Sequence, residues 1–298
     1  MSNGGANASS RAPTAHDEVA MRLVATCPDS IGIVAAVAGF LADCDANIES
    51  SHQHSSDPRG GTFFLRMQFV VPWETAAQVA ERFGPEVAEH FAMEWQMREV
   101  SDRKRVAVLV SRQGHCLDEL LWRWRHDELE AELVLVASNH PDLRGVVEAA
   151  GLPYHHIPVE RTDKPAAEAA LFKALHERCD LVVLARYMQV LSSDLLNRLA
   201  VPLINIHHSF LPAFAGAGPY ERAHARGVKL IGATAHYVTD DLDEGPIIEQ
   251  DVIRVNHEHD VDSLRRLGAH IERSVLARAV QWHCQDRVLR HQNTTVVF

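Results

Sequence analysis

The strongest constraint on the fold is a pattern of apolar runs that begins near residue 105. Four runs of strand length, "VAVLVS", "ELVLVAS", "DLVVLA" and "VPLINI", are almost continuously apolar, which is typical of strands buried on both faces. Helical stretches separate them at 117–127, 142–150, 164–178 and 193–199. The alternation predicts an α/β domain with a Rossmann-like, mostly parallel, doubly wound sheet. "LIGATAHYV" and "PIIEQDVIRV" predict further strands, and a long helix is expected at about 260–283.

A smaller unit is predicted in front of this domain, at residues 18–100. Its strand-like and helix-like segments follow one another in the order βαββαβ, which is the ferredoxin-like arrangement. The second helix, "WETAAQVAERFGPEVAEHF", is expected to be interrupted near its Gly-Pro pair. Residues 1–17 have the composition of a disordered tail, "SDRKR" at 101–105 is the expected linker, and the large domain is expected to fill 106–298.

Composition narrows the classes of partner. The net charge of -11 argues against nucleic acid or an anionic membrane as the partner. No apolar stretch approaches the about 20 residues that span a bilayer. The five cysteines include no C-x-x-C pair, so we expect reduced thiols in a cytoplasmic protein.

Two polar residues stand out at the end of an apolar run, in "INIHHSFLPAF". Asn205 and His207 are two positions apart, so their side chains leave a strand on the same side, at the edge where open α/β sheets bind ligands. An amide donor beside an imidazole suits attack on a carbonyl group. The later "DLDEGPII" loop adds carboxylates. From the residues alone, the choice stays open between structural polar residues at a strand end and metal-free acyl chemistry.

Longer segments carry a resemblance. "NIHHSFLPAFAGAGPYERAHARG" and "GATAHYVTDDLDEGPIIEQ" resemble the folate-dependent formyltransferase family, whose motifs run N-I-H, S-x-L-P, H-x-V and D-x-G. The likeness extends over about residues 104–298. It implies that Asn205 and His207 are catalytic and that Asp243, the carboxylate directly before the "x-G-x-I-I" segment, tunes the histidine.

The resemblance also implies a folate site. "ARYMQVLS" at 185–192 is similar to the family's folate-binding stretch, so its apolar side chains are expected to pack against the pterin. The implied folate contacts are Met188, Val190, Leu191, His236, Asp240 and Leu242. Folate would be the substrate, no separate cofactor or metal is expected, and a homo-oligomer is implied.

The loop after the first strand of the large domain, "VLVSRQGHCLDEL", bears on the kind of reaction. Transferases of this family that act on a nucleotide amine hold its phosphate there in a Gly/Ser/Asn loop, because backbone N–H groups are reachable in such a loop. Here only Gly114 remains, flanked by Gln113, His115 and Cys116. Arg112 could still meet an anion, so the change is suggestive only.

His208, where the transferases have proline, points in the same direction. Both features resemble the family's hydrolytic, deformylase branch, in which water accepts the formyl group. The implied activity is hydrolysis of 10-formyltetrahydrofolate to tetrahydrofolate and formate, which balances one-carbon pools and supplies formate for purine synthesis. Two alternatives stay open: a formyltransferase with an unidentified amine acceptor, and an inactive folate or amino-acid sensor.

The N-terminal segment "CPDSIGIVAAVAGFLADCDANI" resembles an ACT domain, a regulatory module that this branch carries. The resemblance implies an amino-acid effector near Asp29, Gly32 and Ile33. Helix capping and close packing would explain Asp29 and Gly32 equally simply. The stripe formed by Ile33, Val37 and Leu41 is expected to be core or dimer face.

Three pairs of histidines could suggest a metal: His52 and His54, His155 and His156, and His257 and His259. None has the spacing of a zinc site, so metal-assisted hydrolysis is only a minor alternative. "RVLRHQ", near the end of the chain, is expected to be a solvated basic surface.

Overall fold

The computed structural model describes residues 18–160, 163–212 and 218–298. The chain divides into two compact units, Met1–Asp102 together with the terminal Phe298, and Arg103–Val297. Within the described residues no helix is long and apolar enough to cross a membrane.

The first unit is a four-stranded antiparallel sheet with two helices. Along the chain its elements are β1 (Glu18–Pro28), α1 (Ile33–Asp43), β2 (Asn47–Ser55), β3 (Thr62–Pro72), α2 (Trp73–Phe83), the π-helix η1 (Gly84–Ala88) and β4 (Glu94–Glu99). The strands lie in the order β2-β3-β1-β4, and every pairing is antiparallel. The βαββαβ prediction is confirmed, and the second helix changes to π geometry at the Gly84–Pro85 pair.

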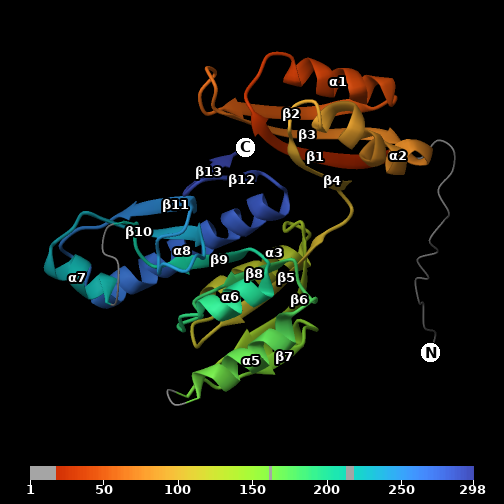
Figure 1. Cartoon of the computed structure of the whole chain (residues 1–298). Helices are drawn as coiled ribbons and strands as arrows, with labels where there is room; N and C mark the ends of the chain where they lie inside the picture. Colours follow the sequence, from red (N-terminus) through yellow and green to blue (C-terminus); the bar gives the residue numbers. More distant parts are fainter. Residues whose placement is uncertain (1–17, 161–162, 213–217) are drawn as a thin grey trace, which may run out of the picture. The chain divides into compact units, whose positions relative to one another are not determined.

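One face of this sheet carries the core of the unit. The stripe predicted on α1, made of Ile33, Val37 and Leu41, is buried. It belongs to one apolar cluster with Leu23 of β1 and Leu65 of β3, and Figure 1 shows α1 running along the sheet. In this unit the stripe is therefore core.

The second unit is built on a seven-stranded sheet. Its elements are β5 (Lys104–Val110), α3 (His115–Arg125), β6 (Ala131–Ser138), α4 (Arg144–Ala149), β7 (Tyr154–His156), α5 (Lys164–Leu175), β8 (Leu181–Leu184), α6 (Ser193–Leu199), β9 (Leu203–His207), α7 (Pro219–Ala225), β10 (Leu230–Tyr237), β11 (Ile247–Arg254), α8 (Val261–Cys284), β12 (Val288–His291) and β13 (Thr294–Val297). The strand order is β11-β10-β9-β8-β5-β6-β7, with β12 and β13 as a separate hairpin.

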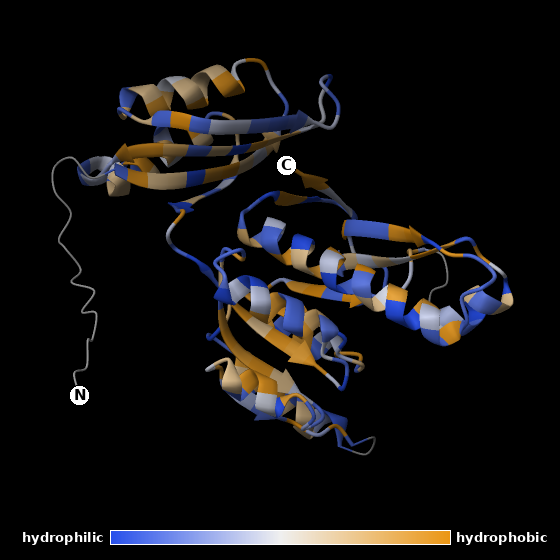
Figure 2. Ribbon diagram, turned by 180° about the vertical axis from the view of Figure 1, so that it is seen from behind, coloured by the Kyte–Doolittle hydropathy of each residue, from blue (hydrophilic) through white to orange (hydrophobic). Residues whose placement is uncertain are grey.

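Alternate residues of the central strands face two different cores. On β5, Val106 and Val108 belong to a cluster that includes side chains of α3 and α8. Their neighbours Ala107 and Leu109 belong to a second cluster, with side chains of α5 and α6. In Figure 2 the central strands are mostly orange, whereas α8 alternates between orange and blue. The near-continuous apolar runs are therefore strands buried on both faces, and the doubly wound prediction is confirmed.

One edge of this sheet differs from a fully parallel pattern. β9 pairs with β10 antiparallel, and so does β10 with β11, so the sheet is mixed at this edge.

The segment "RVLRHQ" is not simply a basic surface, because its residues 288–291 form β12, which pairs with β13. Leu289 is buried there, and the Arg290 guanidinium lies 3.8 Å from the ring centroid of Tyr237. Arg290 is exposed, as expected for a basic surface, but the strand itself was not predicted, because alternation over four residues is too short to reveal one.

A shortened chain that begins at Arg103 should fold on its own. The apolar cluster of the first unit lies within residues 21–88, and both clusters of the second unit lie beyond residue 105. We therefore expect a single cooperative thermal transition for the shortened chain. A broad transition without native near-ultraviolet circular dichroism would show that the second unit depends on the first.

Candidate active site

The strand order of the second unit places a cleft at one edge of its sheet. From β5 the chain proceeds outward through β6 and β7 and then returns to build β8 and β9 on the other side of β5, which creates the switch point where doubly wound sheets bind ligands. A cleft of about 450 Å³ lies at this edge. Its lining includes every residue predicted for catalysis or folate contact, namely Met188, Val190, Leu191, Asn205, His207, His236, Asp240, Leu242 and Asp243.

Asn205 is held by a histidine on the neighbouring strand. The antiparallel register places His236 of β10 directly opposite Asn205 of β9, and Asn205 Nδ2 lies 3.2 Å from His236 Nε2. His236 Nδ1 lies 2.9 Å from the carbonyl oxygen of Tyr237 and must donate to it, so Nε2 of the neutral ring is an acceptor. The amide of Asn205 therefore donates one N–H to His236 and keeps its second N–H for a ligand. His236 is only 3% exposed in its side chain, which makes it a partner of Asn205 within the wall of the cleft.

His207 and Asp243 form an ion pair in the same cleft. His207 Nδ1 lies 3.1 Å from Asp243 Oδ2, and both side chains are largely buried. The hydrogen bond from His207 lowers the pKa of Asp243 well below its usual range even though burial opposes the shift. His236 Nε2 is 3.7 Å from Asp243 Oδ1, a longer separation than its contact with Asn205. The carboxylate thus stays charged and fixes the orientation of the His207 ring.

The other nitrogen of His207 is free for chemistry. Nε2 is buried and has no hydrogen-bond partner within the described residues. Leaving such a group unpaired costs about 1–3 kcal/mol. In the protonated ring, Nε2–H would donate to a substrate carbonyl in the cleft and remove that cost, so the ring is oriented to meet an oxygen atom.

The loop after β10 brings Asp243 back to the histidine. Asp243 has a φ of 60°, a left-handed conformation that aspartate tolerates better than most residues. Two residues later, a Cβ on Gly245 would lie 1.8 Å from the carbonyl oxygen of Tyr237, and the N–H of Tyr237 donates to the carbonyl of Pro246 at 2.9 Å. The D-x-G pattern is therefore a geometric requirement, because the glycine lets the loop close tightly on the end of β10.

The outer part of the cleft presents apolar side chains to solvent. Met188, Val190 and Leu242 are 58%, 56% and 64% exposed, while Leu191 packs partly against the second apolar cluster. The N–H of Met188 donates to Ser111 Oγ at 3.0 Å, which ties the 185–192 stretch to the loop after β5. Exposed apolar side chains of this size around a polar floor suit a flat aromatic ligand.

A second, more polar cavity of about 520 Å³ adjoins the cleft and shares Arg186, His208 and Gly218 with it. Its centre is Glu272 of α8, which is 2% exposed. His115 Nε2 contacts Glu272 Oε2 at 2.8 Å, and the Tyr220 hydroxyl donates to Oε1 at 2.6 Å.

Arg186 completes this cluster of charges. Its Nε lies 3.4 Å from Glu272 Oε2 and donates to Gln113 Oε1 at 2.9 Å. Burial alone would raise the pKa of Glu272, but the hydrogen bond from His115 and the charge of Arg186, with the Tyr220 hydroxyl, lower it to about 2. Sequence reasoning missed this cluster. Arg186 lies inside a stretch noted only for its apolar residues, and Glu272 is one acid among many on a long helix.

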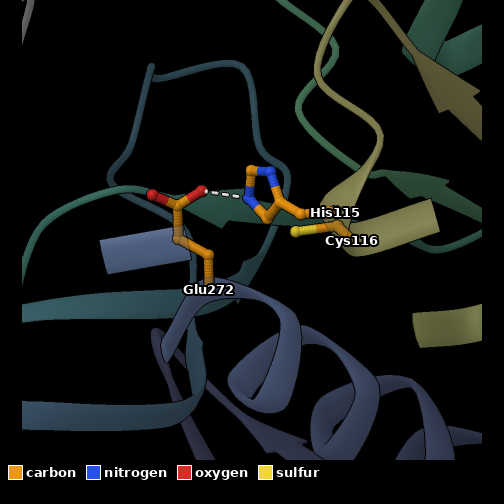
Figure 3. Close-up of side chains that lie close together, drawn as sticks. All are labelled: His115, Cys116 and Glu272. Atoms are coloured by element: carbon orange, nitrogen blue, oxygen red, sulfur yellow. Dashed lines mark hydrogen bonds and ion pairs between the residues drawn. The ribbon is translucent and has the colours of Figure 1, made fainter. Parts of the chain in front are cut away.

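His115, Cys116 and Glu272 converge closely enough to suggest a metal site, and Figure 3 shows their side chains together. Burial and the charge of Glu272 raise the pKa of the Cys116 thiol well above its usual value, which disfavours the thiolate that binds metals. The guanidinium of Arg186 already occupies one side of the same carboxylate. We interpret the group as a hydrogen-bonded ion cluster.

The residues predicted to bind an effector lie around the start of α1. Gly32 has a φ of 97° and stands at the N-terminus of the helix without a side-chain cap. The Asp29 carboxylate accepts a hydrogen bond from the Ser55 hydroxyl and therefore does not cap α1. The Ile33 side chain is 2% exposed and packs in the core.

Comparison with known proteins agrees with this geometry. A family described as formyl transferase matches residues 104–280. Formyltetrahydrofolate deformylase of Mycobacterium bovis is 56% identical, over 93% of this chain and 90% of the relative. The chain belongs to the formyltetrahydrofolate deformylase family. A crystal structure of a deformylase from Pseudomonas syringae pv. tomato superposes with a TM-score of 0.89 at 48% identity, covering 94% of both chains.

A transferase relative overlaps with a smaller part of the chain. Glycinamide ribonucleotide transformylase 1 from Symbiobacterium toebii is 31% identical with a TM-score of 0.61, and it covers 66% of this chain although 94% of its own length is matched. The deformylase relatives, by contrast, match the chain over both of its units.

Replacing Asp243 by asparagine should slow turnover without weakening substrate binding. The change keeps the size of the side chain but removes the charge that holds His207 at 3.1 Å. Loss of a group that supports proton transfer typically costs about 10²–10⁴-fold, so we expect a fall of that order in kcat with KM little changed. Steady-state kinetics with 10-formyltetrahydrofolate measure both.

Asp240→Asn and Asp241→Asn are the matched controls for kcat, and of the two only Asp240, a predicted folate contact, is expected to change KM. Both residues line the same cleft and are exposed. If all three variants slow the reaction equally, the loop acts through its overall charge and the role assigned to Asp243 is wrong.

Gly245→Ala should impair the site by moving the Asp243 loop. The added Cβ would meet the Tyr237 carbonyl oxygen at 1.8 Å, so the backbone must shift and lengthen the His207–Asp243 contact. We expect a loss of kcat of about 10-fold or more, because small misplacements of catalytic groups are costly. Gly145→Ala is the control, since a Cβ there meets nothing within 4 Å. Equal activity of the two variants would contradict this account of the D-x-G motif.

Proposed function

We propose that the protein hydrolyses 10-formyltetrahydrofolate to tetrahydrofolate and formate. The observation that carries the proposal is the convergence of a free amide N–H on Asn205 and an unpaired Nε2 on His207 within one cleft, with Asp243 behind the imidazole. The identity of the deformylase relatives supports the same reaction.

Asn205 and His207 would stabilise the charge that develops on the formyl oxygen. Water adds to the formyl carbon, and the carbonyl electron pair moves onto this oxygen. The N–H of Asn205 and Nε2–H of a protonated His207 donate to it, while Asp243 compensates the imidazolium charge and keeps the ring in place. When the carbon–nitrogen bond breaks, His207 supplies the proton to the leaving nitrogen, and formate is released.

The second cavity favours water over a phosphorylated amine as the acceptor. A phosphate site needs cations or backbone N–H groups that are not already engaged. Here Glu272 contacts His115 and Arg186, and Glu221 and Asp262 pair with Arg265. Arg186 Nη1 is the buried donor of this cavity that has no partner among the described residues, so most of the charge that a phosphate would need is already paired with carboxylates.

The exposed apolar side chains of the cleft would hold the folate. Met188, Val190 and Leu242 flank the opening, and the pterin would lie between them with its formyl group toward Asn205 and His207. Asp240 and His236 complete the predicted contacts. The formate product would feed purine synthesis and balance one-carbon pools.

The first unit would serve regulation. We infer an ACT domain with an amino-acid effector near Asp29 and Gly32, where the left-handed glycine and the Ser55-bound carboxylate lie at the start of α1.

The strands β2 and β4 are the edges of the sheet in this unit. Exposed edges commonly pair with another chain, which supports a homo-oligomer. Starting the chain at Arg103 should abolish any response to amino acids.

Formate release provides the decisive measurement. Purified protein with 10-formyltetrahydrofolate alone should release formate and tetrahydrofolate in equal amounts, and exhaustive chelation should leave the rate unchanged, because the catalytic groups are an amide, an imidazole and a carboxylate. Turnover that requires an added amine and releases no formate would establish a transferase. Loss of activity on chelation, restored by one divalent ion, would establish a metal hydrolase. No turnover with intact folate binding would establish a sensor.

A further inference from the structure

His208 occupies the wall between the folate cleft and the polar cavity. Its side chain lines both, because β9 ends at His207 and the chain turns immediately afterwards. The ring centroid of His208 lies 5.3 Å from that of His207 and 6.1 Å from that of Tyr220. The imidazole therefore stands next to the expected position of the formyl group, on the side from which a nucleophile in the second cavity would arrive.

The other titratable groups around this wall are already engaged. Glu272 is bonded to His115 and Tyr220 and faces Arg186. Asp243 is bonded to His207. A guanidinium has no acceptor site, so Arg186 cannot take a proton from water.

The imidazole of His208 differs from all of these groups. Within the described part of the chain it has no hydrogen-bond partner, so a ring nitrogen is available to a water molecule. Burial and the positive charges of Arg186 and His207, opposed by Glu272 and Asp243, lower the pKa of His208 to about 4. The ring therefore stays neutral at any pH above about 5, and a neutral imidazole keeps one nitrogen as an acceptor.

We propose that His208 orients the attacking water and takes its proton, and that this residue makes water a competent acceptor. This inference rests on the proposed hydrolysis. As the water oxygen bonds to the formyl carbon, its proton moves to the free nitrogen of His208, and the carbonyl electron pair moves onto the oxygen held by Asn205 and His207. The carbon–nitrogen bond then breaks, the leaving nitrogen takes a proton from His207, and solvent restores both histidines. An amine attacks through its own lone pair and needs no such base at that stage, so the role is specific to hydrolysis.

The test compares water with hydroxylamine as the acceptor in the full-length protein. His208→Ala should lower kcat for formate release by about 10²-fold or more, with KM for 10-formyltetrahydrofolate within about twofold. Formyl transfer to hydroxylamine, measured as the coloured ferric hydroxamate, should be nearly unchanged, so the ratio of transfer to hydrolysis should rise by the same factor. His208→Gln keeps a hydrogen-bond acceptor but cannot take a proton, so it should behave like the alanine variant and also serves if that variant folds poorly.

Phe210→Ala is the control, because Phe210 lies close by in sequence but does not line the folate cleft. It should leave both reactions unchanged. Equal losses of hydrolysis and transfer in both His208 variants, or no loss in either, would overturn the proposal. A wild-type protein that releases no formate would instead overturn the hydrolytic function itself, and the inference with it.

Discussion

The antiparallel pairing of β9 with β10 is the constraint on which the site depends. Its register sets His236 opposite Asn205 and Thr234 opposite His207, so the amide receives its partner from the neighbouring strand. Thr234 is fully buried and its hydroxyl oxygen accepts a hydrogen bond from the N–H of Leu211 at 3.0 Å, which fixes the segment that follows His207. A slip of one residue would turn every side chain of β10 to the other face. The loop after β10 would then no longer deliver Asp243 to His207.

Buried charge is compensated in two separate groups at this edge of the sheet. Asp243 is stabilised by His207, and Glu272 by His115, Arg186 and Tyr220. Burying an ion without partners costs several kcal/mol, so neither carboxylate could remain charged alone. The first group leaves His207 Nε2 without a partner, whereas in the second the atom without a partner is Arg186 Nη1. An imidazole can give and take a proton and a guanidinium cannot, so the first group is suited to proton transfer and the second is not.

The sequence predicted the parts of the molecule that follow local periodicity. Apolar runs revealed the buried strands, and the two-residue spacing placed Asn205 and His207 on one side of β9. Resemblance was needed to choose Asp243 among three aspartates, because the loop geometry depends on Gly245 packing against Tyr237, which lies eight residues away. Glu272 and Arg186 could not be predicted, since their pairing joins α8 to the segment after β8 across 86 residues (272 − 186). The β12–β13 hairpin was missed because each strand spans only four residues.

Deformylation and formyl transfer need the same stabilisation of the formyl oxygen, so the groups that provide it cannot determine the acceptor. The residues that select the acceptor must therefore lie on the side of the formyl carbon opposite Asn205 and His207. Arg186 and His208 line both cavities on that side. In the loop after β5, His115 contacts Glu272 and Gln113 accepts a hydrogen bond from Arg186, so neither side chain is open to a large anionic amine. A neutral imidazole at position 208 supplies what water lacks, a proton acceptor within reach. Under the proposed mechanism, specificity for water arises from His208, while Asn205, His207 and Asp243 stabilise the formyl oxygen whichever acceptor attacks.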